Sequence, residues 1–183
     1  MTGAEKRRNR TVDGDRVCAG KQAAALPGSR APSTGSFISR DGRAVACRPL
    51  KIPTDDQMLQ IVGLYRDQGW WQPGDDHSER LISRLIAGSH CFVIATEDER
   101  IVGMGRVISD GASDAYIQDL TVRRDRRKQG IGQFILRTLL ERIHNDGIRW
   151  IALIAEPGSD NLYRRAGFRE MAGSIPMLMI KEP

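Results

Sequence analysis

The densest group of chemically useful residues is the segment 123–132, which reads Arg-Arg-Asp-Arg-Arg-Lys-Gln-Gly-Ile-Gly. It lies between an apolar, strand-like stretch and a long amphipathic one, so we expect it to join a strand to the start of a helix. The first amides of a helix have no partner inside the helix and lie at the positive end of its dipole. Two glycines would let an anion approach that backbone, and five cationic side chains surround it, namely Arg123, Arg124, Arg126, Arg127 and Lys128. The segment therefore predicts a site for a phosphate-bearing ligand.

Two common phosphate-binding motifs do not fit this segment. A P-loop requires a lysine followed by serine or threonine after its last glycine, and Gly130 is followed by Ile131. A dinucleotide-binding fingerprint requires a third glycine where Ile135 stands. What remains is Arg127-x-x-Gly130-x-Gly132, between a predicted strand and a predicted helix.

This remaining pattern resembles the R/Q-x-x-G-x-G/A motif of the GNAT superfamily of acyl-CoA-dependent N-acyltransferases. The stretch from Tyr163 to Gly167-Phe168 resembles the later Y-x-x-x-G-F element of that superfamily. The resemblance extends over about residues 46–180 and keeps the order of the elements. It implies acetyl-CoA as co-substrate and no metal.

The resemblance also implies where the coenzyme would lie. Its pyrophosphate would be held by backbone amides from Arg127, Lys128, Gln129, Gly130, Ile131 and Gly132. Its pantetheine arm would pair, like an added strand, with the strand edge at Leu120, Thr121 and Val122. The arm would occupy a V-shaped opening between the strands 116–122 and 148–155.

The implied reaction moves an acetyl group to a primary amine by direct attack in a ternary complex. Such a transfer needs a base for the amine, a stabilised oxyanion and a proton for the departing thiolate. In the resembling family the tyrosine of Y-x-x-x-G-F faces the coenzyme sulfur, so Tyr163 is the expected acid. None of the three cysteines (Cys18 in the N-terminal segment, Cys47 and Cys91 in predicted strands) is placed as a nucleophile.

The base is left open by the sequence. Asp119 lies within an apolar strand, where a carboxylate needs either a partner or a catalytic role. Glu156 ends the next predicted strand, at a position where the resembling family often has asparagine, and Pro157-Gly158 after it depart from the family's pattern. We favour Asp119 as the base before Glu156, and a chain of water molecules or a site built from backbone alone is the remaining alternative.

The acceptor is expected to be a small-molecule or peptide amine. In the resembling family the loop between the first two helices helps to form the acceptor wall, and here that loop holds Trp70, Trp71 and Asp75. The indoles could cover an apolar or cationic acceptor, and the carboxylate could attract an amine. The alternative is that a tryptophan packs in the core and the aspartate caps the second helix.

Hydrophobic periodicity predicts the elements that would position these residues. A capping box, Thr54 with Gln57, begins a helix that runs to about Gln68, and a second helix ends at Gly88. Further helices are predicted over 130–145 and within 159–166, and strands over 45–50, 91–96, 101–108, 116–122, 148–155 and 176–180. The fold class is therefore mixed α/β (α+β). We expect a GNAT-like, largely antiparallel mixed sheet that is splayed between its fourth and fifth strands, with helices on both faces.

The composition limits the partners. The 183 residues carry a net charge of +5, but residues 1–43 hold nine basic and four acidic residues, so the remainder, 44–183, is neutral. We expect 1–43 to be an unfolded basic extension and 44–183 to be one domain. Three scattered cysteines favour a reducing compartment, hence the cytoplasm, and short apolar runs predict no membrane span. A homodimer is only a family-level expectation.

Two other classes of function are compatible with the sequence. One is a non-catalytic acyl-CoA sensor with the same fold. The other is a nucleic-acid-binding module that uses the basic extension, which the neutral domain and the lack of an RNA- or DNA-reading motif disfavour. Both leave the Tyr163–Phe168 element without a role.

Overall fold

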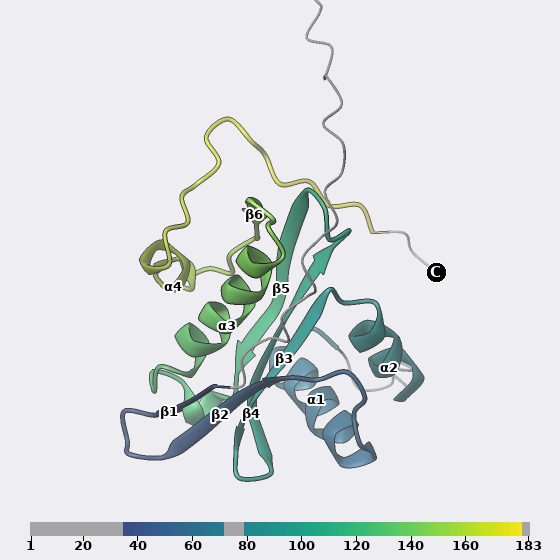
Figure 1. Cartoon of the computed structure of the whole chain (residues 1–183), viewed down its shortest axis with the longest axis vertical. Helices are drawn as coiled ribbons and strands as arrows, with labels where there is room; N and C mark the ends of the chain where they lie inside the picture. The colour runs from purple at the N-terminus through teal and green to yellow at the C-terminus, as the bar shows by residue number, and fades with distance from the viewer. Residues whose placement is uncertain (1–34, 72–78, 181–183) are drawn as a thin grey trace, which may run out of the picture.

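The computed structural model describes residues 35–71 and 79–180, in which six strands form one sheet (Figure 1). The strands follow the order β1-β2-β3-β4-β5-β6, so each lies beside its neighbour in sequence. The neighbouring pairs are antiparallel as far as β5, whereas β5 and β6 run parallel. The predicted fold class, a largely antiparallel mixed sheet with helices, is confirmed.

Most elements begin and end close to the predicted positions, and the exceptions are β1, β6 and the segment 176–180. Their bounds are β1 Gly35–Ile38, β2 Ala44–Pro49, α1 Asp55–Asp67, α2 Glu79–Ala87, β3 Cys91–Glu97, β4 Arg100–Ser109, β5 Asp114–Val122, the 3-10 turn η1 Arg124–Arg126, α3 Ile131–Asn145, β6 Trp150–Ala152 and α4 Asp160–Arg165. The capping box of α1 is present, because the Thr54 hydroxyl accepts from the Gln57 amide while the Gln57 side chain accepts from the Thr54 amide.

Helices cover both faces of the sheet (Figure 1). The helix α3 packs against β2 to β5, and α1 lies on the other face against β4 with α2 beside it. The core on the α3 face includes Ile135, Leu139 and Ile143, and the core on the α1 face includes Ile61 and Leu64. The apolar spacing of α1 and α3 therefore faces the sheet, as the periodicity predicted.

The N-terminal boundary of the folded part differs from the expectation. The strand β1 lies inside the segment 1–43 that was expected to be unfolded, and it pairs with β2 from Gly35 opposite Cys47 to Ile38 opposite Ala44. Alternation is weak along β1, so the sequence gives little signal there, but the hydrogen bonds of β2 and the packing of Phe37 on Phe134 hold it in place. Residues 1–34 of the expected extension lie outside the described part of the chain.

The splay of the sheet lies between β5 and β6, which are the predicted fourth and fifth strands because β1 was not predicted. Their pairing is limited to three positions, from Asp114 opposite Trp150 to Tyr116 opposite Ala152. Beyond this point the amide of Ile154 bonds the phenol of Tyr116 instead of a strand partner, and the chain leads into α4. The strand predicted over 148–155 is therefore shorter than expected, and the outer edge of β5 is uncovered after Tyr116.

The strand predicted over 176–180 is wrong in this structure. These residues have no regular secondary structure, and Met177, Leu178 and Met179 are each more than four-fifths exposed. The physical reason is that a strand needs a hydrogen-bonded neighbour, and no strand among the described residues pairs with this segment.

Among the helices of the described residues, none is long and apolar enough to cross a membrane.

Candidate functional site

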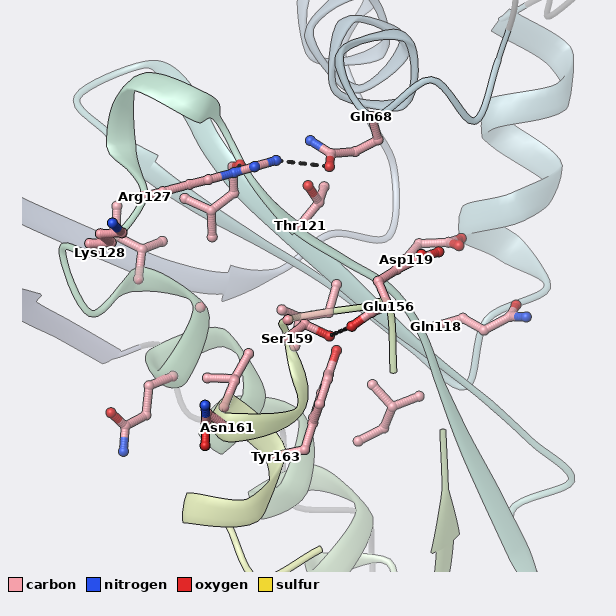
Figure 2. Close-up of a pocket in the computed structure, with 18 of the residues that line it drawn as sticks. Gln68, Gln118, Asp119, Thr121, Arg127, Lys128, Glu156, Ser159, Asn161 and Tyr163 are labelled. Atoms are coloured by element: carbon pink, nitrogen blue, oxygen red, sulfur yellow. Dashed lines mark hydrogen bonds between the residues drawn. The ribbon is translucent and has the colours of Figure 1, made fainter. Parts of the chain in front are cut away.

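A cleft of about 820 Å³ opens where β5 and β6 separate. One wall is the strand β5 from Tyr116 to Val122, and the opposite wall is the segment 154–165, which includes α4. The turn before α3 closes one end, and Gln68 and Trp70 contribute from the end of α1. Figure 2 shows Thr121, Tyr163 and Lys128 around this space, so the predicted opening and its predicted lining lie together.

The turn into α3 has the backbone of an anion site. Gly130 is the N-cap of α3 and has φ +92°, a conformation that only glycine adopts without strain. The first intrahelical bond runs from the Phe134 amide to the Gly130 carbonyl, so the amides of 131–133 precede the hydrogen-bonded ladder of the helix. Lys128, two residues earlier, has φ +62°. Gly130, Ile131 and Gly132 line the cleft, so these amides lie at its end.

The five cationic side chains of this segment do not act together, contrary to the expectation. The Arg126 side chain is only 6% exposed and is ion-paired with Asp41, at 2.6 Å, and with Glu97. Arg124 donates to the backbone carbonyl of Asp67 at 2.8 Å. Arg126 therefore has a structural role. From its position in the sequence we expected its charge at the anion site, but two carboxylates neutralise it.

Arg127 and Arg40 support the turn from outside it. Arg127 donates to the side-chain oxygen of Gln68 at 2.9 Å, which ties the turn to the end of α1 (Figure 2). Arg40 donates from its backbone to the Gln129 carbonyl at 3.3 Å and from its guanidinium to the Lys128 carbonyl at 3.1 Å. Sequence reasoning missed Arg40 because it lies in the segment assigned to the unfolded extension. Its distance of 88 residues from Lys128 leaves no local signal.

A β-bulge interrupts β5 where it lines the cleft. Thr121 lies opposite Met104 and Gln118 lies opposite Arg106, so both Asp119 and Leu120 face the single residue Gly105. Asp119 takes φ +54° to accommodate the extra residue. Such a conformation is strained for a residue with a Cβ and persists where the surrounding contacts impose it.

The contacts of Asp119 explain how that conformation is held. Its Oδ2 accepts from the Tyr65 hydroxyl at 2.7 Å and from the Arg106 Nε. Arg106 also donates to the Gln118 side chain at 2.8 Å. Figure 2 shows the Asp119 carboxylate pointing away from Tyr163, so this predicted site residue presents its backbone rather than its carboxylate to the cleft.

Tyr163 projects from α4 into the cleft (Figure 2). The amide of Phe168 bonds the Tyr163 carbonyl at 3.1 Å, and the two rings meet edge-on at 6.1 Å, so the Gly-Phe of the predicted motif fixes the tyrosine. Burial, and after it the negative charge of Glu156, raise the pKa of the Tyr163 phenol. The phenol therefore carries its proton at neutral pH.

Glu156 lines the same cleft as Tyr163, near enough for its charge to affect the phenol. Its carbonyl accepts from the Ser159 hydroxyl at 2.7 Å and from the Ser159 amide at 3.0 Å, which forms the turn before α4. Within the described chain the carboxylate has no ion pair. Pro157 and Gly158 also line the cleft. The chain therefore leads into α4 along this wall, although these two residues depart from the pattern of the resembling family.

The predicted acceptor residues separate in the structure. Trp70 lines the cleft, is 37% exposed and meets the Tyr65 ring edge-on at 5.8 Å. Trp71 stacks on Tyr65 at 4.1 Å with an interplanar angle of 9° and packs against the α1-side core. Asp75 lies outside the described residues.

Two cysteines are buried in the sheet. Cys47 and Cys91 are free thiols, and burial raises the pKa of each to about 11. A thiol with so high a pKa is a poor nucleophile at neutral pH, in agreement with the sequence interpretation.

Comparison with known proteins gives a consistent result. The family described as "Acetyltransferase (GNAT) domain" matches residues 61–175. An uncharacterized N-acetyltransferase of Porphyra purpurea is 33% identical over 69 residues, 38% of this chain and 40% of that protein. A probable acetyltransferase of Glycine max is 33% identical over 116 residues, 56% of this chain and 44% of that protein. The chain thus matches less than half the length of each of these two relatives.

A solved structure matches over a greater length. A probable acetyltransferase of unknown function from meticillin-resistant Staphylococcus aureus superposes with a TM-score of 0.63 at 25% identity. The superposition covers 75% of this chain and 99% of that one.

Proposed function

Because the chain belongs to the GNAT acetyltransferase family, we propose that it transfers an acetyl group from acetyl-CoA to a primary amine in a ternary complex. The observation that carries the proposal is the cleft between β5 and β6, which joins a helix N-terminus, an open strand edge and a protonated tyrosine in one space. The helix N-terminus suits a pyrophosphate, and the strand edge suits an amide-bearing arm.

The coenzyme would lie along β5. Its pyrophosphate would accept from the backbone amides at Gly130, Ile131 and Gly132, with Lys128 beside it. Its pantetheine arm would pair with the edge at 120–122, which β6 leaves uncovered. The residues fit this role, because Gly130 has the positive φ that turns the backbone into the helix, and an added Cβ at Gly132 would project among the lining residues Val122, Leu162 and Leu120.

The transfer would need one proton donor at the sulfur. The neutral amine nitrogen attacks the thioester carbonyl, the nitrogen of the tetrahedral intermediate loses a proton to water, the carbon–sulfur bond breaks, and the thiolate takes a proton from the Tyr163 phenol. The phenolate regains a proton from water after the products leave. The raised pKa of Tyr163 supports this role, since the group must be protonated at the start of each turnover.

For the base we propose Glu156 before Asp119. Glu156 lines the cleft near Tyr163, where it could remove a proton from an incoming ammonium directly or through water. Asp119 already accepts from Tyr65 and Arg106 through one oxygen, and its carboxylate points away from Tyr163. We therefore propose that Asp119 stabilises the bulge in β5 and does not act as the general base.

The acceptor would enter past Trp70. Trp70 and Tyr116 contribute apolar surface to the cleft, and Glu156 contributes a negative charge. An indole and a carboxylate together favour an amine carried on an apolar or cationic body.

The free, buried Cys47 and Cys91 are in keeping with the further proposal of a cytoplasmic location.

The experiment that tests the function is a thiol-release screen with the full chain and acetyl-CoA against small amines, amino acids and peptides. Release that depends on an acceptor, with an acetylated product of matching mass, supports the proposal. A shift in melting temperature on adding acetyl-CoA, without thiol release for any acceptor, would instead favour a sensor of acyl-CoA. No shift and no release would contradict both.

A further inference from the structure

Two arginine side chains of the turn before α3 reach across to the end of α1. The Arg124 guanidinium donates to the backbone carbonyl of Asp67 at 2.8 Å, and the Arg127 guanidinium donates to the side-chain oxygen of Gln68 at 2.9 Å. Figure 2 shows the Arg127 side chain extended toward Gln68. Asp67 is the last residue of α1, where the negative end of the helix dipole favours a cation. The turn that would hold the coenzyme phosphates is therefore bonded to the end of another helix.

The end of α1 in turn sets the position of Trp70. The amide of Gly69 bonds the Arg66 carbonyl at 2.9 Å, and the amide of Trp70 bonds the Tyr65 carbonyl at 3.1 Å. With φ +75° at Gly69, these two bonds form a Schellman motif, which ends the helix and fixes the direction of the chain after it. Trp70 follows directly and lines the cleft. A shift of the last turn of α1 would therefore move Trp70 as well.

The Gln68 side chain is held in place through its oxygen. Its Nε2 is buried and has no hydrogen-bond partner among the described residues. A buried donor without a partner is unfavourable, so this nitrogen does not favour the observed orientation. The bond from Arg127 to the oxygen does favour it.

The charges of the turn make its contact with α1 sensitive to a bound anion. Within the described chain the side chains of Arg124, Arg127 and Lys128 form no ion pair, and the nearby Asp125 is already paired with two other arginines. Cations so close together repel one another, and an anion between them would offset that repulsion. The two arginines should therefore hold α1 more firmly when the turn carries a phosphate.

We propose that Arg124 and Arg127 are positioning residues for the acceptor wall, and that phosphate bound at the turn orders Trp70 through them. The inference rests on the proposed function, because it takes the phosphates of acetyl-CoA as the anion. The two guanidinium groups act on α1, while the backbone amides of 131–133 hold the coenzyme. The acceptor would then meet an ordered wall only after acetyl-CoA has bound.

Hydrogen exchange of the full chain with and without saturating acetyl-CoA tests the proposal. In the wild type we expect acetyl-CoA to slow exchange of the amides of 131–133, and also of the amides of 68–70 by about threefold or more. In Arg127→Met and in Gln68→Met the protection of 68–70 should decrease. In the double variant Arg124→Met with Arg127→Met it should be lost, while the protection of 131–133 remains. Calorimetry sets the acetyl-CoA concentration that saturates each variant.

Tryptophan emission adds a signature that a loss of fold would not reproduce. Acetyl-CoA should change the emission of the wild type, and Trp70→Phe should abolish that change. The double variant should bind acetyl-CoA without the change and keep the melting temperature of the wild type, because both arginines are exposed. The matched control is Arg137→Met, since this exposed arginine lies on α3 and does not line the cleft. It should behave as the wild type in each measurement.

The two sets of amides separate this inference from the proposed function. Protection of 131–133 in the wild type with no effect at 68–70 would overturn the inference and leave the function standing. Absence of protection at 131–133 would place the coenzyme elsewhere and overturn both. Protection of 68–70 that persists in the double variant would mean that α1 is ordered by another route. A folded double variant that no longer binds acetyl-CoA would mean that the guanidinium groups hold the coenzyme themselves. Either result would contradict the inference.

Discussion

The Tyr65 hydroxyl on α1 donates a 2.7 Å hydrogen bond to the carboxylate of Asp119 in the bulge of β5. This bond joins a helix on one face of the sheet to the strand whose edge lines the cleft. Trp71 stacks on the same tyrosine, and Trp70 meets it edge-on. The wall proposed for the acceptor and the strand proposed for the coenzyme are therefore linked through one side chain. Burial, followed by the charge of Asp119, raises the pKa of Tyr65, so the hydroxyl remains a donor.

Replacing Tyr163 tests the proton donor. We expect Tyr163→Phe to lower kcat by about 10²–10⁴-fold, the range typical of a lost general acid, while the dissociation constant of acetyl-CoA changes little. Because burial and Glu156 raise the pKa of this phenol, the wild-type rate should fall only at a pH above the ordinary tyrosine value near 10, and the variant should lack that decline. A kcat close to that of the wild type would remove Tyr163 from the mechanism.

Replacing the two carboxylates separates the base from the positioning residue. Glu156→Gln should lower kcat without changing the melting temperature. It should also move the alkaline limb to lower pH, since removal of the negative charge lowers the pKa of Tyr163.

Asp119→Asn should behave differently, because it removes the ion pair with Arg106. We expect a loss of about 1–3 kcal/mol of stability, a raised KM for the acceptor and a smaller loss of kcat than in Glu156→Gln. Tyr65→Phe should reproduce part of this effect, since it removes one of the two donors. If Asp119→Asn lowers kcat strongly while Glu156→Gln leaves it near the wild-type value, the two assignments are reversed.

Two glycines with the same backbone conformation separate ligand binding from strain. Gly130 has φ +92° at the cleft, and Gly147 has φ +79° after α3, where an added Cβ meets nothing within 4 Å. Gly130→Ala and Gly147→Ala should each cost about 1–2 kcal/mol of stability, because a Cβ is unfavourable at positive φ. Only Gly130→Ala should weaken acetyl-CoA binding, by about tenfold or more in calorimetry. Equal affinities in the two variants would place the pyrophosphate elsewhere.

Arg126 with its partners Asp41 and Glu97, the Arg126 cluster, predicts that the stability of the protein decreases at acidic pH. The Arg126 guanidinium holds the pKa of Asp41 well below its ordinary value. A carboxyl group whose pKa is lowered by folding contributes stability above about pH 4. This stability is lost as the pH falls toward the pKa that the group has in the folded protein. Thermal melts should therefore show a steeper loss of stability below pH 4 in the wild type than in Arg126→Met. Parallel curves for the two proteins would show that the cluster does not contribute.

Much of the fold could be predicted from local patterns. The capping box at Thr54, the apolar spacing of α1 and α3, and the glycine at 130 depend on neighbours within a few residues, and they appear in the structure as predicted. The strand β1 and the segment 176–180 could not be predicted in this way, because a strand forms only when a distant partner supplies its hydrogen bonds. Arg40 was missed for a similar reason, because its partner Lys128 is 88 residues away in the sequence.

By itself, the sequence determined the chemistry available at the site. A helix start with Gly130 and Gly132, and a tyrosine four residues before Gly167, follow from spacing alone. Tertiary structure decided which charges are available to a ligand. It buried Arg126 between Asp41 and Glu97, turned the Asp119 carboxylate toward Tyr65 and Arg106, and left Glu156 beside Tyr163. These pairings join residues 29 to 85 positions apart in the Arg126 cluster, so they depend on how the layers pack and leave no trace in local sequence.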